Sequence, residues 1–217
     1  MPLHHFRFLR EAGIETWLVV HERNIEELRA NFSSSEFSRI HFARETKAMT
    51  WLWRITKKLP DRIKALILEP SLQVMTQRQQ RQIVRELISK VRATVVHQPT
   101  PVSPKLPSFM HSLGAPVVIG PMNGGMCYPP AFLNRQSRFE RITFKMARTS
   151  SALINWLIPG KGKATALVVA NERTRLALPK GLPHPVAMIS ENGVDTKYWQ
   201  ANAIDERTQN KPGCGHF

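Results

Sequence analysis

The sequence predicts an α/β fold, a doubly wound and mostly parallel Rossmann-like sheet with helices on both faces. Short runs rich in β-branched residues recur along the chain, and most are continuous apolar stretches, as in strands buried on both faces of a parallel sheet. Helical stretches separate these runs, which favours right-handed crossover connections between parallel strands. The 217 residues are 42% hydrophobic, which is enough for one sizeable core.

The predicted elements alternate in chain order. The predicted strands cover residues 17–20, 39–42, 94–96, 116–119, 166–169 and 186–189. The predicted helices cover residues 3–12, 44–59, 73–91, 107–113, 133–157 and 171–178. Gly13 and Gly114 each follow a predicted helix, where glycine forms a left-handed C-cap at the lowest cost. We expect one domain over residues 1–200, a stiff proline-rich loop at 98–107, and a linker or tail at 201–217.

The charge of the chain favours anionic partners. Lys and Arg number 31 against 16 Asp and Glu, which gives a net charge of +15 and attracts phosphates, nucleic acid or an acidic membrane surface. The two cysteines, Cys127 and Cys214, cannot build a disulfide framework and offer no metal-ligand spacing, so no metal is expected. No apolar run approaches the roughly 18 to 20 residues of a membrane span. We expect a cytoplasmic protein that is at most peripheral to the inner membrane.

Polar or glycine-rich residues follow five of the predicted strands. Ligands of open parallel sheets bind beyond the carboxyl ends of the strands, so this coincidence predicts a cleft along one edge. Each segment alone is more often a solvated loop than a ligand contact. The five segments are His21-Glu22-Arg23, His97-Gln98-Pro99, Gly120 to Gly125, Asn171-Glu172-Arg173 and Ser190 to Gly193.

The segment Gly120 to Gly125 is the most informative of the five. Its glycines allow backbone N–H groups to approach an anion or a sugar hydroxyl, although a tight turn has the same composition. It matches neither the Walker motif nor the dinucleotide fingerprint. His97 has two interpretations: it donates to a substrate hydroxyl, or it bonds a nearby carbonyl as a core residue. His4 and His5 are interpreted as surface residues of the first helix.

The predicted helix 133–157 has a basic face. Arg138, Arg141, Lys145 and Arg148 fall within roughly an 80° arc of a helical wheel, beside an apolar stripe. Such a face fits anionic lipid headgroups, although a solvated outer face of a core-packed helix is the more common explanation. Arg54, Lys57 and Lys58 form a second basic patch with the same two interpretations.

Four segments together resemble the N-terminal half of a group 1 (family 4) glycosyltransferase, over about residues 3–200. They are His97 to Pro101, Gly120 to Gly125, Val168 to Arg175, and Glu191 to Asp195 with Trp199. The resemblance implies two Rossmann-like domains that face a cleft, with the acceptor on the N-terminal domain and a nucleotide-sugar donor mostly on the other. It implies sugar transfer to a glycan or glycolipid with retention of configuration, and no cofactor besides the donor as co-substrate.

The resemblance also implies which residues line the acceptor side of the cleft, although it assigns no catalytic residue. These residues are His97, Asn123, Gly124, Gly125, Asn171, Glu172, Arg173, Glu191 and Asn192.

The chain departs from the family pattern at both ends. The first strand with its glycine-rich turn, and the C-terminal domain with its paired glutamates, have no counterpart, so we expect a fragment that is inactive alone and needs the C-terminal domain in trans. Two alternatives stay open. One is a basic α/β module that binds nucleic acid, although standard nucleic-acid motifs are absent from the sequence. The other is a non-catalytic remnant or partner subunit.

Overall fold

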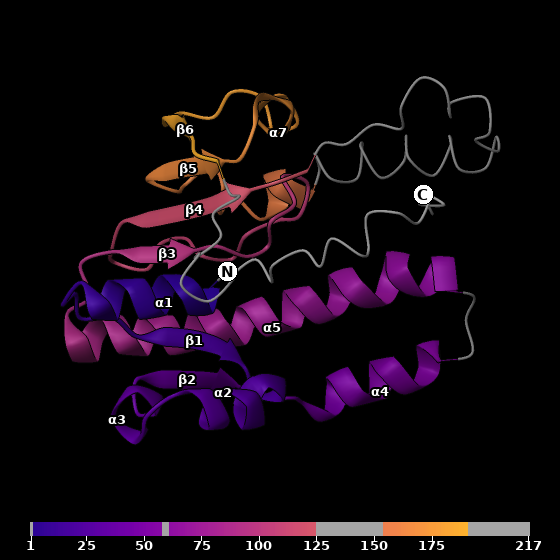
Figure 1. Ribbon diagram of the computed structural model, residues 1–217. Helices are drawn as coiled ribbons and strands as arrows, with labels where there is room; N and C mark the ends of the chain where they lie inside the picture. Colours follow the sequence, from indigo (N-terminus) through magenta and orange to yellow (C-terminus); the bar gives the residue numbers. More distant parts are fainter. Residues whose placement is uncertain (1, 58–60, 125–153, 191–217) are drawn as a thin grey trace, which may run out of the picture.

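The computed structural model describes residues 2–57, 61–124 and 154–190 (Figure 1). Its strands are β1 (Leu18–His21), β2 (Ile40–Ala43), β3 (Val96–Gln98), β4 (Val117–Met122), β5 (Ala166–Val169) and β6 (Val186–Met188). Its helices are α1 (Pro2–Glu11), η1 (Glu22–Asn24), α2 (Ile25–Asn31), α3 (Ser34–Phe37), α4 (Lys47–Thr56), α5 (Asp61–Val91) and α7 (Glu172–Leu176). The predicted α/β class and the parallel pairing of the strands are confirmed.

The strands form two sheets rather than the single predicted one. Strands β1 and β2 pair with each other, and β3, β4, β5 and β6 form a second sheet in chain order. In Figure 1 helix α1 lies between β1 and β3, at the place where one continuous sheet would have continued. Among the described residues, β1 and β3 therefore each have one edge that pairs with no other strand.

Two hydrophobic clusters follow this division. The larger one lies in the second sheet, where Ile119 and Met122 of β4 and Leu167 and Val169 of β5 are fully buried. Half-buried residues lie between buried ones in both strands, so both faces carry apolar side chains and the strands appear as continuous apolar runs in the sequence. The smaller cluster joins α1 and α2 to the first sheet and has Phe6, Leu28, Phe32 and Ile40 as its buried members.

Helix α5 connects the two sheets. It packs against both strands of the first sheet, and its Val84 and Ile88 pack against the core of the second. The sequence predicted only its C-terminal part, residues 73–91, whereas the helix begins at Asp61 and includes Pro70. A proline in a helix removes one backbone hydrogen bond, which is why the sequence indicated a shorter helix.

The predicted helix at 107–113 is wrong, because side chains and a strand bridge satisfy the backbone there instead of helical hydrogen bonds. The N–H of Phe109 donates to Gln77 Oε1 at 3.1 Å, and the N–H of Met110 donates to the Ser108 hydroxyl at 3.1 Å. Ser108 also forms an isolated parallel bridge with Pro159. Gly114 keeps its left-handed conformation, with φ +85°, although no helix precedes it.

The proline-rich loop is anchored by one buried lysine. The Nζ of Lys161, whose side chain is only 2% exposed, donates to the carbonyls of Pro104 and Leu106, each at 2.5 Å. The carbonyl of Lys161 accepts a hydrogen bond from His184 Nε2, also at 2.5 Å. Lys161 therefore ties the loop before β4 to the segment that leads into β5.

Candidate functional site

Asn123 and Asn171 meet where β4 and β5 end. Asn171 Nδ2 donates to Asn123 Oδ1 at 3.1 Å, and the N–H of Asn123 donates to the carbonyl of Val102 at 2.8 Å. Asn123 is exposed and Asn171 is half-buried. The Nδ2 of Asn123 bonds no other described residue, so it remains available as a donor at the carboxyl edge of the sheet.

A buried threonine holds this asparagine pair in place. The Thr174 hydroxyl accepts a hydrogen bond from the N–H of Gly124 at 3.0 Å, and lies 3.0 Å from the carbonyl of Gly124 and 2.9 Å from Asn171 Oδ1. Asn171 also caps α7, since its Oδ1 accepts the N–H of Thr174 at 2.9 Å. We call Asn123, Gly124, Asn171 and Thr174 the asparagine cluster. The sequence predicted three of these residues and missed Thr174, whose place within Asn-Glu-Arg-Thr, three residues after a capping asparagine, was the available signal.

Replacing Thr174 with valine is expected to lower the free energy of unfolding by about 1–3 kcal/mol, because the isosteric side chain removes the hydroxyl that bonds both the N–H and the carbonyl of Gly124. Urea denaturation followed by circular dichroism measures the change. The matched control is Thr16→Val, which removes a hydroxyl bonded only to the carbonyl of Ile14 near the surface and should change stability by less than about 0.5 kcal/mol. Equal effects of the two substitutions would contradict the anchoring role of Thr174.

His97 lies on β3, the strand next to β4, and its side chain already has a partner. Its Nε2 donates to the carbonyl of Gly120 at 2.6 Å, which favours the carbonyl-bonding interpretation of this histidine. Gly120 is three residues before Asn123, so this bond fixes the strand that leads into the asparagine cluster. The structure thus places His97 as a residue that positions β4.

His5 contacts His97, although the sequence analysis interpreted His5 as a surface residue of the first helix. Its ring lies 5.4 Å from the ring of His97, measured between centroids, and joins α1 to β3. Burial, followed by the neighbouring His97, lowers the pKa of His5 below its usual value.

Two further predicted site residues follow β5, namely Glu172 and Arg173. The carboxylate of Glu172 forms two hydrogen bonds with Arg175, at 2.6 and 2.7 Å, and this pairing lowers the pKa of Glu172. Arg173 is exposed. Neither side chain joins the asparagine cluster.

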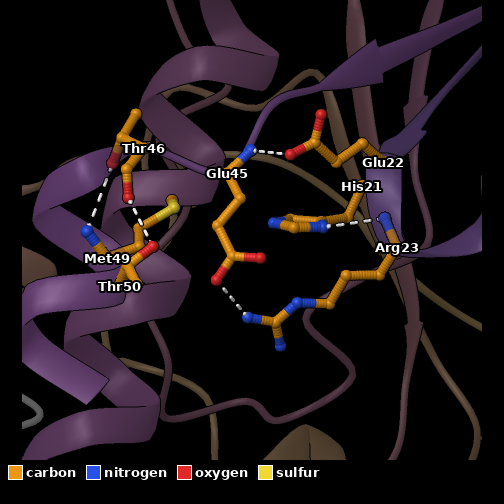
Figure 2. A network of polar contacts seen from close by, with 7 residues as sticks. All are labelled: His21, Glu22, Arg23, Glu45, Thr46, Met49 and Thr50. Carbon is orange, nitrogen blue, oxygen red and sulfur yellow. Dashed lines mark hydrogen bonds and ion pairs between the residues drawn. The ribbon is translucent and has the colours of Figure 1, made fainter. Parts of the chain in front are cut away.

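A second polar network lies at the carboxyl ends of β1 and β2 (Figure 2). Arg23 Nη2 contacts Glu45 Oε1 at 2.8 Å, and the N–H of Glu45 donates to the carboxylate of Glu22. The N–H of Arg23 donates to His21 Nδ1 at 3.2 Å. The hydrogen bond from Arg23 is the main reason that the pKa of Glu45 is lowered. The network connects the two strand ends and leads directly into Thr46, which caps α4 through its hydroxyl.

The remaining predicted site residues lie outside the described part of the chain. These are Gly125, Glu191 and Asn192 of the cleft, and Arg138, Arg141, Lys145 and Arg148 of the basic helix face. In the segments that the structure does describe, no three His, Cys, Asp or Glu side chains gather as metal ligands. The helices within those segments include none that is both long and apolar enough to cross a bilayer.

Comparison with known proteins adds no further assignment. No family model, no curated protein and no solved structure matches this chain. The asparagine cluster and the network at His21 therefore rest on the geometry given above.

Proposed function

We propose that this chain is the acceptor-binding domain of a retaining glycosyltransferase, built on a Rossmann-like fold, which transfers a sugar from a nucleotide-sugar donor to a glycan or glycolipid. The observation that carries the proposal is the pair formed by Asn123 and Asn171 across the ends of two adjacent parallel strands. In open α/β sheets, that edge is where ligands bind.

The chemistry of the pair suits a sugar hydroxyl. A hydroxyl both donates and accepts a hydrogen bond, and a carboxamide offers both an N–H donor and a carbonyl acceptor. The backbone of Gly124 next to the pair is held by Thr174, so the amides are already oriented before a ligand arrives. Orientation of the acceptor is the contribution to catalysis that such a domain supplies. Stabilisation of the departing diphosphate would belong to a second domain acting in trans.

The basic residues of the chain support the same proposal. The net charge of +15 favours the approach of a negatively charged donor or a phosphorylated glycolipid. Arg173 is exposed immediately after Asn171 and Glu172, at the carboxyl edge of β5.

Binding of neutral sugars tests the proposal. Glucose, galactose, mannose and N-acetylglucosamine are titrated separately into the full chain, and the side-chain amide signals of Asn123 and Asn171 are followed by ¹H–¹⁵N correlation spectra. At least one sugar is expected to shift both amide signals, because a bound hydroxyl replaces water on them. UDP-glucose should shift them no more than free glucose does.

In the Asn123→Ala variant the Asn171 amide signal is expected not to respond to the sugar, because the carboxamide that would bind the hydroxyl is gone. The variant should still fold, since the Asn123 side chain is exposed. The control is Asn24→Ala, which removes an exposed asparagine that makes no side-chain cap hydrogen bond to α2. The proposed acceptor site would be refuted if no sugar shifted the Asn123 and Asn171 signals of the wild type. It would also be refuted if the Asn171 signal shifted equally in wild type and in Asn123→Ala.

A further inference from the structure

Helix α4 exposes large apolar side chains to solvent. Trp51 is 62% exposed, Ile55 is 49% exposed and Trp53 is 48% exposed. The opposite face of the helix carries the buried residues Met49 and Thr56, and α4 packs against α5. Two exposed tryptophans on one short helix are unusual for a surface that faces only water.

A basic stripe runs between these apolar side chains. At 100° per residue, Lys47, Arg54 and Lys57 occupy the middle of the exposed face, with Trp53 on one side and Trp51 and Ile55 on the other. The Lys57 ammonium lies 5.7 Å from the centre of the Trp53 ring. The sequence has no Asp or Glu between residues 46 and 60, so the surface carries charge of one sign. We call these five exposed residues of α4, together with Lys57, the α4 surface.

We propose that the α4 surface binds the protein to an anionic phospholipid membrane. Tryptophan rings settle at the level of the lipid headgroups, where one part of the ring is apolar and the indole N–H is solvated. Lysine and arginine on the same face contact the phosphates, and their aliphatic stems lie along apolar surface. A bilayer interface therefore satisfies both kinds of side chain on this helix at once.

A membrane fits the α4 surface better than a nucleic acid does. Stacking of bases requires open aromatic faces, and the Lys57 side chain is placed over the ring of Trp53. Ile55 offers an aliphatic surface that a phosphate backbone cannot use and that an acyl boundary can.

Hydrogen bonds hold the N-terminal end of α4 in place. Thr46 caps the N-terminus of α4, and the preceding Glu45 is held by both Arg23 and Glu22 (Figure 2). In Figure 1, α4 and α7 lie at opposite ends of the described structure. A membrane bound at α4 would thus leave the asparagine cluster free. Membrane binding through α4 does not depend on the function proposed above.

Co-sedimentation with vesicles tests the proposal on the full chain. Vesicles of phosphatidylcholine and phosphatidylglycerol in equal parts are expected to bind the protein, and vesicles of phosphatidylcholine alone should bind it far less. Arg54→Gln with Lys57→Gln is expected to lower the partition coefficient about 30-fold, at about 1 kcal/mol for each basic residue near an anionic surface. Trp51→Ala with Trp53→Ala should lower it on the order of tenfold, because apolar contact with the interface is lost.

The charge-matched control is Lys163→Gln with Lys180→Gln, which removes two exposed lysines that are not on α4. Partition of this control should stay within about threefold of wild type, since long-range attraction by net charge is weak at physiological salt. Circular dichroism confirms that each variant is folded. An equal loss for the Arg54 and Lys57 variant and for the Lys163 and Lys180 variant would overturn the assignment. So would unchanged partition of the tryptophan variant, or binding of oligodeoxythymidine with no binding to anionic vesicles.

Discussion

Replacing Gly120 with alanine is expected to destabilise the protein by roughly 3–5 kcal/mol, which would leave little of it folded. A Cβ atom built at this position would lie 2.1 Å from the carbonyl oxygen of Val168 and 2.9 Å from the backbone nitrogen of Met122. Both atoms belong to the backbone of the paired strands β4 and β5, so neither can rotate away. The φ angle of +122° adds strain that an L side chain rarely tolerates.

Alanine variants at two other glycines separate the steric clash from the backbone strain. Gly114→Ala meets nothing within 4 Å but has φ +85°, so it should cost only the backbone strain, about 1–2 kcal/mol. Gly162→Ala has its nearest atom at 3.6 Å and no positive φ, so it should be close to neutral, within about 0.5 kcal/mol. Urea unfolding of all three variants gives the comparison. A Gly120→Ala effect no larger than that of Gly114→Ala would show that β4 can move away from β5.

Stability is expected to rise with pH above neutrality because of Lys161. Burial lowers the pKa of its ammonium from the usual 10.5 to about 7. The neutral amine still has two N–H donors for the carbonyls of Pro104 and Leu106, so the native contacts survive deprotonation. Between about pH 7 and pH 10.5 the unfolded chain binds one proton more than the native protein, and stability then rises by up to about 1.4 kcal/mol per pH unit.

The pH range over which Lys161 affects stability sets the range in which unfolding is measured. Below about pH 7 the lysine is charged in both states, and above about pH 10.5 it is neutral in both, so its contribution to the slope is confined between these limits. From about pH 7.5 to pH 9.5, wild type should gain about 2–3 kcal/mol more than Lys161→Met does. Lys163→Met removes an exposed neighbour and should keep the wild-type slope. Parallel pH profiles for wild type and Lys161→Met, measured by urea unfolding, would disprove the buried neutral amine.

The strands of the larger core were the most predictable part of the fold. Strand β5 occupies the predicted residues, and β4 begins within one residue of its predicted start. In both strands buried residues are separated by half-buried ones, and apolar side chains occupy both kinds of position. Helices α2 and α3 were not predicted, since neither is long enough to show a helical period. The capping box formed by Ser33 and Glu36 was the local signal for α3.

The candidate site was predictable where it follows from strand order alone. Asn123 and Asn171 follow, within two residues, the ends of two strands that are neighbours in the sheet, so the edge rule brought them together. The contact of His5 with His97 and the burial of Lys161 depend on how α1 and the proline-rich loop pack. Tertiary contacts of this kind leave no periodic pattern in a single sequence.

The division of the strands into two sheets gives the molecule two ladders that share no hydrogen bond. The β1–β2 ladder can therefore open while every bond from β3 to β6 stays intact; within the described residues, the packing of α5 and the contacts of α1 are among the interactions that oppose this opening. We therefore expect the N-terminal layer to open at a free energy below that of complete unfolding, which native-state hydrogen exchange of the β1 and β2 amides would measure.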